Sequence, residues 1–273
     1  MSDINTSTAA RASDAASPTD FPPDVDLGHV TSNFRQYLMG WGEAERGEGD
    51  ADYYRSGLAQ PQFNGVVRMR DLNRVGYALD EARKRLTGVP WWWWVGPDSP
   101  QGTSTALVDH GAVEFGALPL MVRSLDRAAK QDEPPIGLRI ERVADPGRLA
   151  DLVRTYSASI GISSDLQDDL VRIEAQRPDN ADMVRLVAVL DGQAIGTTVV
   201  ITAHGVAGIF LVHVTDTHRR LGVGSALTAA ALRVGRERGM KCAALTASPA
   251  GELLYRRLGF VAVSEYRLFT LPA

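Results

Sequence analysis

The stretch Arg219-Arg220-Leu221-Gly222-Val223-Gly224 decides how the second half of this chain is interpreted. It lies between an apolar run, Val206–Val214, and a segment whose apolar residues have helical spacing, Gly222–Arg238. Glycines at such a turn let backbone N–H groups approach a ligand without an intervening Cβ. The unpaired N–H groups and the dipole of a new helix favour a phosphate, and Arg219 adds a positive charge beside them. The stretch therefore predicts a site for a phosphate-bearing ligand.

Two familiar phosphate sites do not fit this stretch. A dinucleotide fingerprint would have a third glycine where Leu227 stands, and an acidic residue at the end of the next strand, Cys242–Thr246. A Walker loop would continue with Gly-Lys-Ser or Gly-Lys-Thr, which is absent here. The preceding strands, Val184–Leu190, Ala194–Thr202 and Val206–Val214, are separated by the hairpin dipeptides Asp191-Gly192 and His204-Gly205, so we expect an antiparallel meander rather than a parallel unit.

A second string lies downstream, Leu254-Tyr255-Arg256-Arg257-Leu258-Gly259-Phe260. With it, the chain resembles the GNAT superfamily of acyl-CoA-dependent N-acyltransferases. Val214–Gly224 is similar to that family's pyrophosphate loop, Arg/Gln-x-x-Gly-x-Gly/Ala, and the second string is similar to its Leu-Tyr-x-x-x-Gly-Phe signature. The resemblance covers Leu138–Ala273 in its order of elements, and its sharpest part is Val212–Phe260.

The resemblance implies a set of acetyl-CoA contacts. Backbone amides from Leu221 to Ser225 would hold the pyrophosphate, and a backbone N–H near Val212 or Val214 would polarise the thioester carbonyl. Ser248 lies where many members carry an asparagine that contacts the cofactor. The cofactor-binding set is therefore Val212, Val214, Arg219, Arg220, Leu221, Gly222, Val223, Gly224, Ser225, Ser248 and Tyr255.

The catalytic candidates are Tyr255 and His213. Tyr255 lies where the family often places a general acid for the departing thiolate, and a tyrosine is protonated at neutral pH. It would equally suit the core of an amphipathic helix. His213 has a side chain that titrates near neutrality, but a packed or solvent-facing histidine explains it as well. Direct attack of an amine on the thioester needs no nucleophilic side chain. This agrees with the position of Cys242 in an apolar strand rather than beside an activating base.

Composition narrows the class of protein. The chain has 273 residues, a formal net charge of −4 and one cysteine. The charge argues against a basic nucleic-acid surface, and one cysteine excludes an intrachain disulfide and fits a reducing compartment. No apolar run is long enough for a membrane span, and the Ser-, Thr- and Ala-rich N-terminus is unlike a secretory signal. We expect a cytoplasmic protein that requires no metal, with no nucleic-acid or membrane partner; a homodimer is left open.

We predict an α/β fold with a mixed α+β sheet, in two tandem GNAT-like halves whose sheets are mostly antiparallel. The expected parts are a disordered tail over 1–22, an accessory or degenerate GNAT-like domain over 23–130 and the catalytic domain over 137–273, with Asp126–Pro135 as linker. The first half has no Arg-x-x-Gly-x-Gly match, and a helix is expected over Thr31–Arg46. Its run Trp91–Trp94 would either pack at a domain interface or form a platform for a cationic substrate.

The expected activity is transfer of the acetyl group of acetyl-CoA directly to an amine on a small molecule. Protein or peptide N-acetylation, acylation of an amino-sugar thiol conjugate in the manner of mycothiol synthase, and a non-catalytic acyl-CoA sensor are the alternatives. The sequence does not identify the acceptor, the oligomeric state or the general base.

Overall fold

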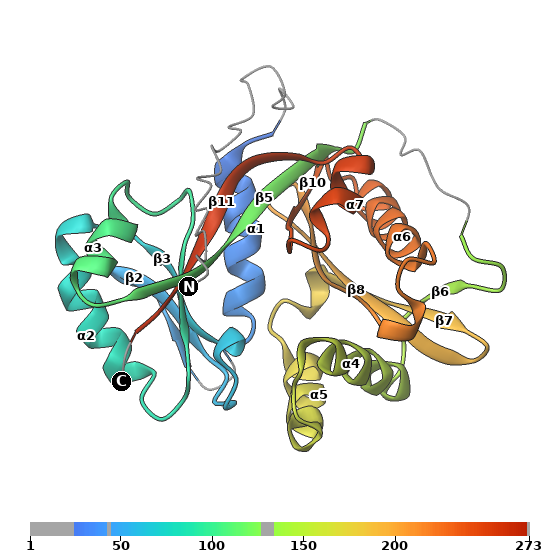
Figure 1. The fold of residues 1–273 in the computed structure, drawn as a ribbon, viewed down its shortest axis with the longest axis horizontal. Coiled ribbons are helices and arrows are strands. Elements are labelled where there is room, and N and C mark those ends of the chain that lie inside the picture. Colours follow the sequence, from blue (N-terminus) through green and yellow to red (C-terminus); the bar gives the residue numbers. More distant parts are fainter. Residues whose placement is uncertain (1–24, 43–44, 127–133, 272–273) are drawn as a thin grey trace, which may run out of the picture.

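The computed structural model describes residues 25–42, 45–126 and 134–271 (Figure 1). The tail predicted over 1–22 and most of the predicted linker lie outside these ranges. The helices of the described part are α1 (Leu27–Met39), α2 (Val75–Arg85), α3 (Thr103–Asp109), α4 (Pro146–Ile160), α5 (Gln167–Gln176), α6 (Val223–Glu237) and α7 (Glu252–Arg257). None of them is long and apolar enough to cross a membrane.

The described strands form one mixed sheet that runs through the whole molecule. In chain order they are β1 (Glu45–Gly47), β2 (Ala51–Arg55), β3 (Asn64–Met69), β4 (Trp92–Val95), β5 (Val113–Ser124), β6 (Arg139–Arg142), β7 (Met183–Leu190), β8 (Gln193–Ala203), β9 (Val206–Val214), β10 (Cys242–Thr246) and β11 (Val261–Thr270). Their order across the sheet is β1-β2-β3-β4-β11-β5-β10-β9-β8-β7-β6.

The antiparallel ladder predicted from the sequence is interrupted by two parallel pairs, one in each half. β3 is parallel to β4, and β9 is parallel to β10. The sheet is therefore mixed. In each half a helix, α2 or α6, carries the chain back along the sheet, so that the next strand runs parallel to the one before it. The remaining neighbours are antiparallel, including the predicted meander β7-β8-β9.

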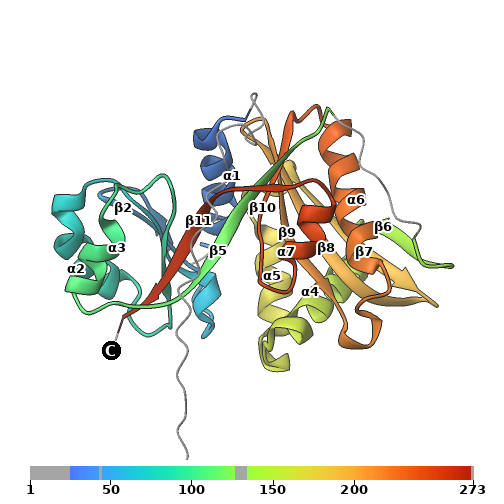
Figure 2. The ribbon, with the colours of Figure 1, turned by 45° about the horizontal axis from the view of Figure 1, so that its top comes forward.

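The two halves exchange strands. β5 leaves the first half and pairs on one side with β10 of the second half, while β11, the last strand, pairs with β4 of the first half. β5 and β11 are also paired with each other along their length. Figures 1 and 2 show these two strands crossing side by side between the lobes. Each lobe thus depends on a strand from the other part of the chain.

Local sequence explains the elements that surround β9. Both residues of each hairpin turn, Asp191-Gly192 and His204-Gly205, have positive φ, as a two-residue turn that matches the twist of the strands requires. Helix α6 buries the apolar residues expected from its spacing, which are Val223, Leu227, Ala230 and Val234. It packs on one face of β7, β8 and β9, and α4 packs on the other (Figure 1).

The prediction of a helix over Thr31–Arg46 was wrong at both ends. Helix α1 begins after Asp26, whose carboxylate accepts a hydrogen bond from the N–H of Gly28, and it ends at Met39 before Gly40. Arg46 belongs to β1 instead. Helix α1 lies between the lobes and contacts β2 and β3 on one side and β8 and β9 on the other (Figures 1 and 2).

The four tryptophans are divided between two layers of the core. Trp93 is fully buried beneath α2 and α3, whereas Trp94 packs edge-on against Phe34 of α1 at 5.6 Å between ring centroids. Trp92 is partly exposed and lies 5.1 Å from the ring of Phe115. The alternation expected of a strand is confirmed, and packing accounts for the two buried indoles.

Candidate functional site

The start of α6 exposes backbone amides without a side-chain cap. Gly222 is the N-cap residue in the left-handed region at φ 84°, and no side chain of the described residues caps it. The helices α1 and α4, in contrast, start at Asp26 and Asp145, whose carboxylates accept amide hydrogen bonds. Because the first amides of a helix have no partner inside it, those of Val223 and Gly224 are available to an anion.

Gly224 brings the three parts of the candidate site together. A Cβ placed on this glycine would lie 3.3 Å from Leu254 Cδ2 of α7 and 3.9 Å from Val214 Cγ2 of β9. The end of β9, the first turn of α6 and helix α7 therefore meet at one residue. The two strings that were separated in the sequence are in contact in the fold.

Strand β9 separates from β10 before either strand ends. Their parallel pairing stops at Gly208 and Ala244, while β9 continues to Val214 on the ladder with β8. On its other side, β10 pairs with β5. Within the described part of the chain, the backbone of β9 beyond Gly208 consequently has no strand neighbour on its β10 side.

A β-bulge lies in this separated part of β9. The register between β8 and β9 shifts between Thr197 and Val199, where β9 has one residue more than β8, and Leu211 has a φ of 50°. A positive φ is strained for a leucine, and such strain persists only where surrounding contacts impose it. The bulge turns the backbone around Val212, the first of the two residues expected to polarise a thioester.

Two fully buried threonines support the bulge. Thr197 Oγ1 donates to the carbonyl oxygen of Leu211 at 2.7 Å, and Thr198 Oγ1 donates to that of Phe210 at 3.3 Å. Sequence reasoning missed both residues, because threonine is also an ordinary strand residue and nothing in the sequence gives the register of the bulge.

His213 lies on the face of the sheet opposite to α6. Val212 and Val214 pack in the clusters beneath α6, so alternation along the strand directs His213 toward the face that α4 covers. Burial, together with the nearby charge of Arg219, lowers the pKa of His213 to about 4. The imidazole is therefore neutral at pH 7 and is a weak base.

Tyr255 is held by close packing in α7. Its side chain is 7% exposed, and its ring lies edge-on to Phe260 at 5.9 Å between centroids. A Cβ on Gly251 would lie 2.9 Å from the Tyr255 ring, so this glycine, which sequence reasoning also missed, leaves room for the ring. Burial raises the pKa of Tyr255 to about 12, and the hydroxyl stays protonated.

The remaining predicted residues are placed around the same loop. Arg219 is exposed, forms an ion pair with Asp216 at 2.7 Å and donates to the carbonyl of Val214. Arg220 has a positive φ of 62°, Leu221 is 54% exposed and Ser225 is buried. Ser248 is exposed, and its hydroxyl accepts a hydrogen bond from the N–H of Gly251 at the start of α7.

Cys242 lies at the start of β10 and is buried, and burial raises the pKa of its thiol to about 11. A thiol with a raised pKa is a poor nucleophile, as expected from the apolar strand around it.

Comparison with known proteins identifies this arrangement. The model of the acetyltransferase (GNAT) family matches residues 151–260. Residues 151–260 form a GNAT acetyltransferase domain. Proteins of this family are acyl-CoA-dependent N-acetyltransferases that use acetyl-CoA as a co-substrate and act on amine acceptors. No curated protein matches the chain in sequence.

Solved structures extend the likeness to nearly the whole chain. A GCN5-related N-acetyltransferase from Kribbella flavida has a TM-score of 0.70 at 20% identity, covering 90% of this chain and 96% of its own. One from Sphaerobacter thermophilus has a TM-score of 0.61 at 18% identity, with 82% and 76% covered. A tandem GNAT protein from the clavulanic acid biosynthesis pathway has a TM-score of 0.55 at 14% identity, with 91% and 97% covered. At these identities the likeness concerns the fold, and it confirms the predicted GNAT fold with tandem halves.

The first GNAT-like half differs from the second at the turn before α2, which corresponds to the turn before α6. Before α2, the carboxylate of Asp71 accepts a hydrogen bond from the N–H of Asn73, so an incoming anion would meet a negative charge. β3 and β4 separate after Val66 and Trp93, but the N–H of Met69 at the end of β3 donates to Ser99 Oγ. Both contacts make this turn less suitable than the start of α6 for binding acetyl-CoA.

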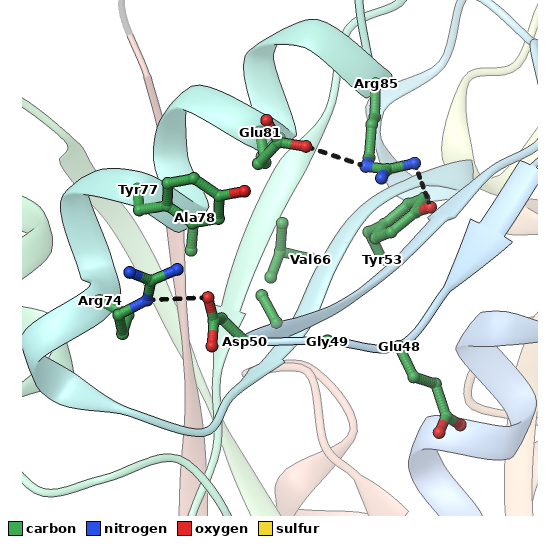
Figure 3. Close-up of a pocket in the computed structure, with 12 residues that line it drawn as sticks. Glu48, Gly49, Asp50, Tyr53, Val66, Arg74, Tyr77, Ala78, Glu81 and Arg85 are labelled. Carbon is green, nitrogen blue, oxygen red and sulfur yellow. Dashed lines mark hydrogen bonds and ion pairs between the residues drawn. The ribbon is translucent and has the colours of Figure 1, made fainter.

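A cavity of about 380 Å³ lies elsewhere in the first half, between β2 and α2 (Figure 3). Tyr53 and Tyr77 line it, and Arg74 forms an ion pair with Asp50 at 3.0 Å across one end. None of the predicted site residues is among the described residues that line it. This cavity is therefore separate from the candidate acetyl-CoA site.

Proposed function

We propose that this protein transfers the acetyl group of acetyl-CoA directly to an amine on a small molecule. The observation that supports it best is the separation of β9 from β10, which opens toward the uncapped first turn of α6. A long ligand with a phosphate at one end and an acyl group at the other fits such a gap, because amides lie at its wide end and β9 backbone along its side.

The residues that would hold the carrier follow from this arrangement. The amides that open α6 at Gly222 would bind the pyrophosphate, and the exposed guanidinium of Arg219 would lie beside it. Ser248 would contact acetyl-CoA through its hydroxyl, which also stabilises the turn before α7. When bound, acetyl-CoA supplies a thioester whose carbonyl carbon is open to attack by an amine.

The proposed chemistry needs carbonyl polarisation and two proton movements. The N–H of Val212, oriented by the bulge, would donate to the carbonyl oxygen as negative charge develops on it. The amine nitrogen forms a bond to the carbonyl carbon, and the carbon–sulfur bond breaks. Tyr255 would donate its proton to the departing thiolate, and His213, directly or through water, would accept the proton that the amine loses.

The test of the site uses a glycine substitution with a matched control. Gly222→Trp places a bulky side chain at the start of α6, where, of the described residues, a Cβ would meet only Pro135, at 3.8 Å. Gly192→Trp introduces the same residue at a similar φ of 80°, in the hairpin between β7 and β8. We expect acetyl-CoA to raise the melting temperature of the wild type and of Gly192→Trp but not of Gly222→Trp, as measured by differential scanning fluorimetry.

Unchanged stabilisation of folded Gly222→Trp by acetyl-CoA would remove the site assignment. The acceptor class requires a separate assay, in which thiol release from acetyl-CoA is followed with small amines and with peptides. Release with small amines supports the proposal, and release with peptides alone favours protein N-acetylation. Tight binding of acetyl-CoA with no release in either panel indicates a sensor.

A further inference from the structure

A small apolar cavity lies at the point where β9 and β10 first separate. Its volume is about 10 Å³, and it is lined by residues of four elements. Gly208 and Phe210 come from β9, and Ala244 and Leu245 come from β10. The other wall comes from α1, outside the GNAT domain of residues 151–260, and from Leu120 of β5.

Helix α1 is fixed at this point by a buried asparagine. The Asn33 side chain is 1% exposed, and its Nδ2 donates to the carbonyl oxygens of Ile201, Ala203 and Val206 at 3.0–3.1 Å. A Cβ on Gly208 would lie only 1.9 Å from Asn33 Oδ1, so the glycine permits this close approach. The hydrogen bonds and the glycine together hold α1 tightly on the β8–β9 hairpin.

Phe34, the residue next to Asn33 on α1, is also constrained by its packing. Its ring stacks on Tyr266 at 4.1 Å between centroids and lies 6.1 Å from Phe210. Phe210 in turn stacks on Tyr37 at 3.8 Å. Rings packed this closely against one another cannot move aside without creating a cavity elsewhere, so this wall has little freedom to yield.

We infer that α1 restricts the transferred acyl group to acetyl. Helix α1 does so by closing the gap between β9 and β10 at the far end of the acyl group. The inference rests on the proposed function. If the pyrophosphate is bound at Gly222 and the carbonyl at Val212, the acyl tail continues along β9 toward Gly208. A cavity of about 10 Å³ is comparable to one water-sized probe. The methyl group of an acetyl is about the size of such a probe, whereas the two further carbons of a butyryl group would have to displace the α1 wall.

The test compares the binding of CoA, acetyl-CoA and butyryl-CoA by calorimetry, which requires no knowledge of the acceptor. We expect the wild type to bind acetyl-CoA at least tenfold more tightly than butyryl-CoA. Val30→Ala and Phe34→Leu both remove volume from the α1 wall, and each should reduce this ratio at least threefold. Phe63→Leu, a buried phenylalanine packed on Trp41 away from the cavity, is the control and should keep the wild-type ratio.

Two results would overturn the inference while the proposed function stands. One is equal affinity of the wild type for acetyl-CoA and butyryl-CoA, which decides the matter even if the variants do not fold. The other is an unchanged ratio in folded Val30→Ala and Phe34→Leu. Failure of the wild type to bind any of the three ligands would instead overturn the proposed function, and this inference with it.

Discussion

His213 and Tyr255 show how burial changes single side chains near β9. The His213 pKa of about 4 lies below the value of 6.5 expected in the unfolded chain. Between these two values the unfolded chain binds a proton that the folded chain does not, so the free energy of unfolding decreases as pH falls from 6.5 toward 4. Above pH 6.5 this contribution is constant.

We therefore predict that His213→Gln makes stability less sensitive to acid. The melting temperature of the wild type should fall more steeply between pH 6.5 and pH 4 than that of the variant, as measured by circular dichroism. His218→Gln, in the turn after β9, controls for loss of an imidazole nearby. Parallel curves for the wild type and His213→Gln would show that His213 is not titrating in this way.

Tyr255→Phe tests the role of one hydroxyl without removing the ring that packs on Phe260. We expect turnover to fall roughly a hundredfold, a typical contribution of a positioned acid, while the Kd of acetyl-CoA changes less than about twofold. Thiol release and calorimetry measure the two quantities. Tyr77→Phe, at an exposed tyrosine of α2, is the control. Wild-type turnover in Tyr255→Phe would leave this residue only a packing role.

In the proposed mechanism, polarisation of the thioester carbonyl depends on the bulge in β9. Thr197→Val keeps the shape of the side chain but removes its hydrogen bond to Leu211. We expect kcat to fall roughly tenfold, because small displacements of a catalytic donor are costly, with little change in acetyl-CoA affinity. Thr202→Val removes a hydrogen bond from the same strand to Asp182, away from the bulge, and is the control. Equal activity of the two variants would contradict a role for the bulge.

Elements with strong local signals could be predicted from the sequence. The spacing of Val223 and Leu227 gave α6, and the dipeptides Asp191-Gly192 and His204-Gly205 gave the meander, because both signals act within a few residues. The ends of α1 were misplaced, since the cap at Asp26 outweighed the apolar pattern further along. The hydrogen bond of Thr197 to Leu211 could not be predicted, because it depends on a register between two strands.

At the scale of the whole molecule, the exchange of β5 and β11 joins the two halves into one sheet. The sequence did not reveal this exchange, because a strand's own residues do not identify a partner far along the chain. The proposed domains, 23–130 and 137–273, each contain one of the exchanged strands. Each range taken alone therefore leaves the edge of β4 or of β10 without its neighbour.

We predict that neither half folds alone. Fragments covering residues 25–126 and 134–273 should each lack a cooperative thermal transition, because an unpaired central edge leaves backbone groups and apolar side chains exposed. Expressed together, they should form a one-to-one complex that melts cooperatively, as judged by size-exclusion chromatography and calorimetry. The matched control is the full chain carrying a protease site within 127–133, cut after purification. Cooperative melting of the isolated 134–273 fragment would contradict the prediction.

The long separation of β4 and β11 along the sequence also has a consequence for biosynthesis. β4, with Trp93 and Trp94, already has β3 as one neighbour but is translated long before β11, its neighbour on the other side, emerges from the ribosome. Throughout that interval the nascent chain carries an open, tryptophan-rich edge, a surface that chaperones bind and that favours aggregation when translation is fast. Recombinant yield should therefore depend strongly on growth temperature and chaperone supply, even though the finished molecule is closely packed.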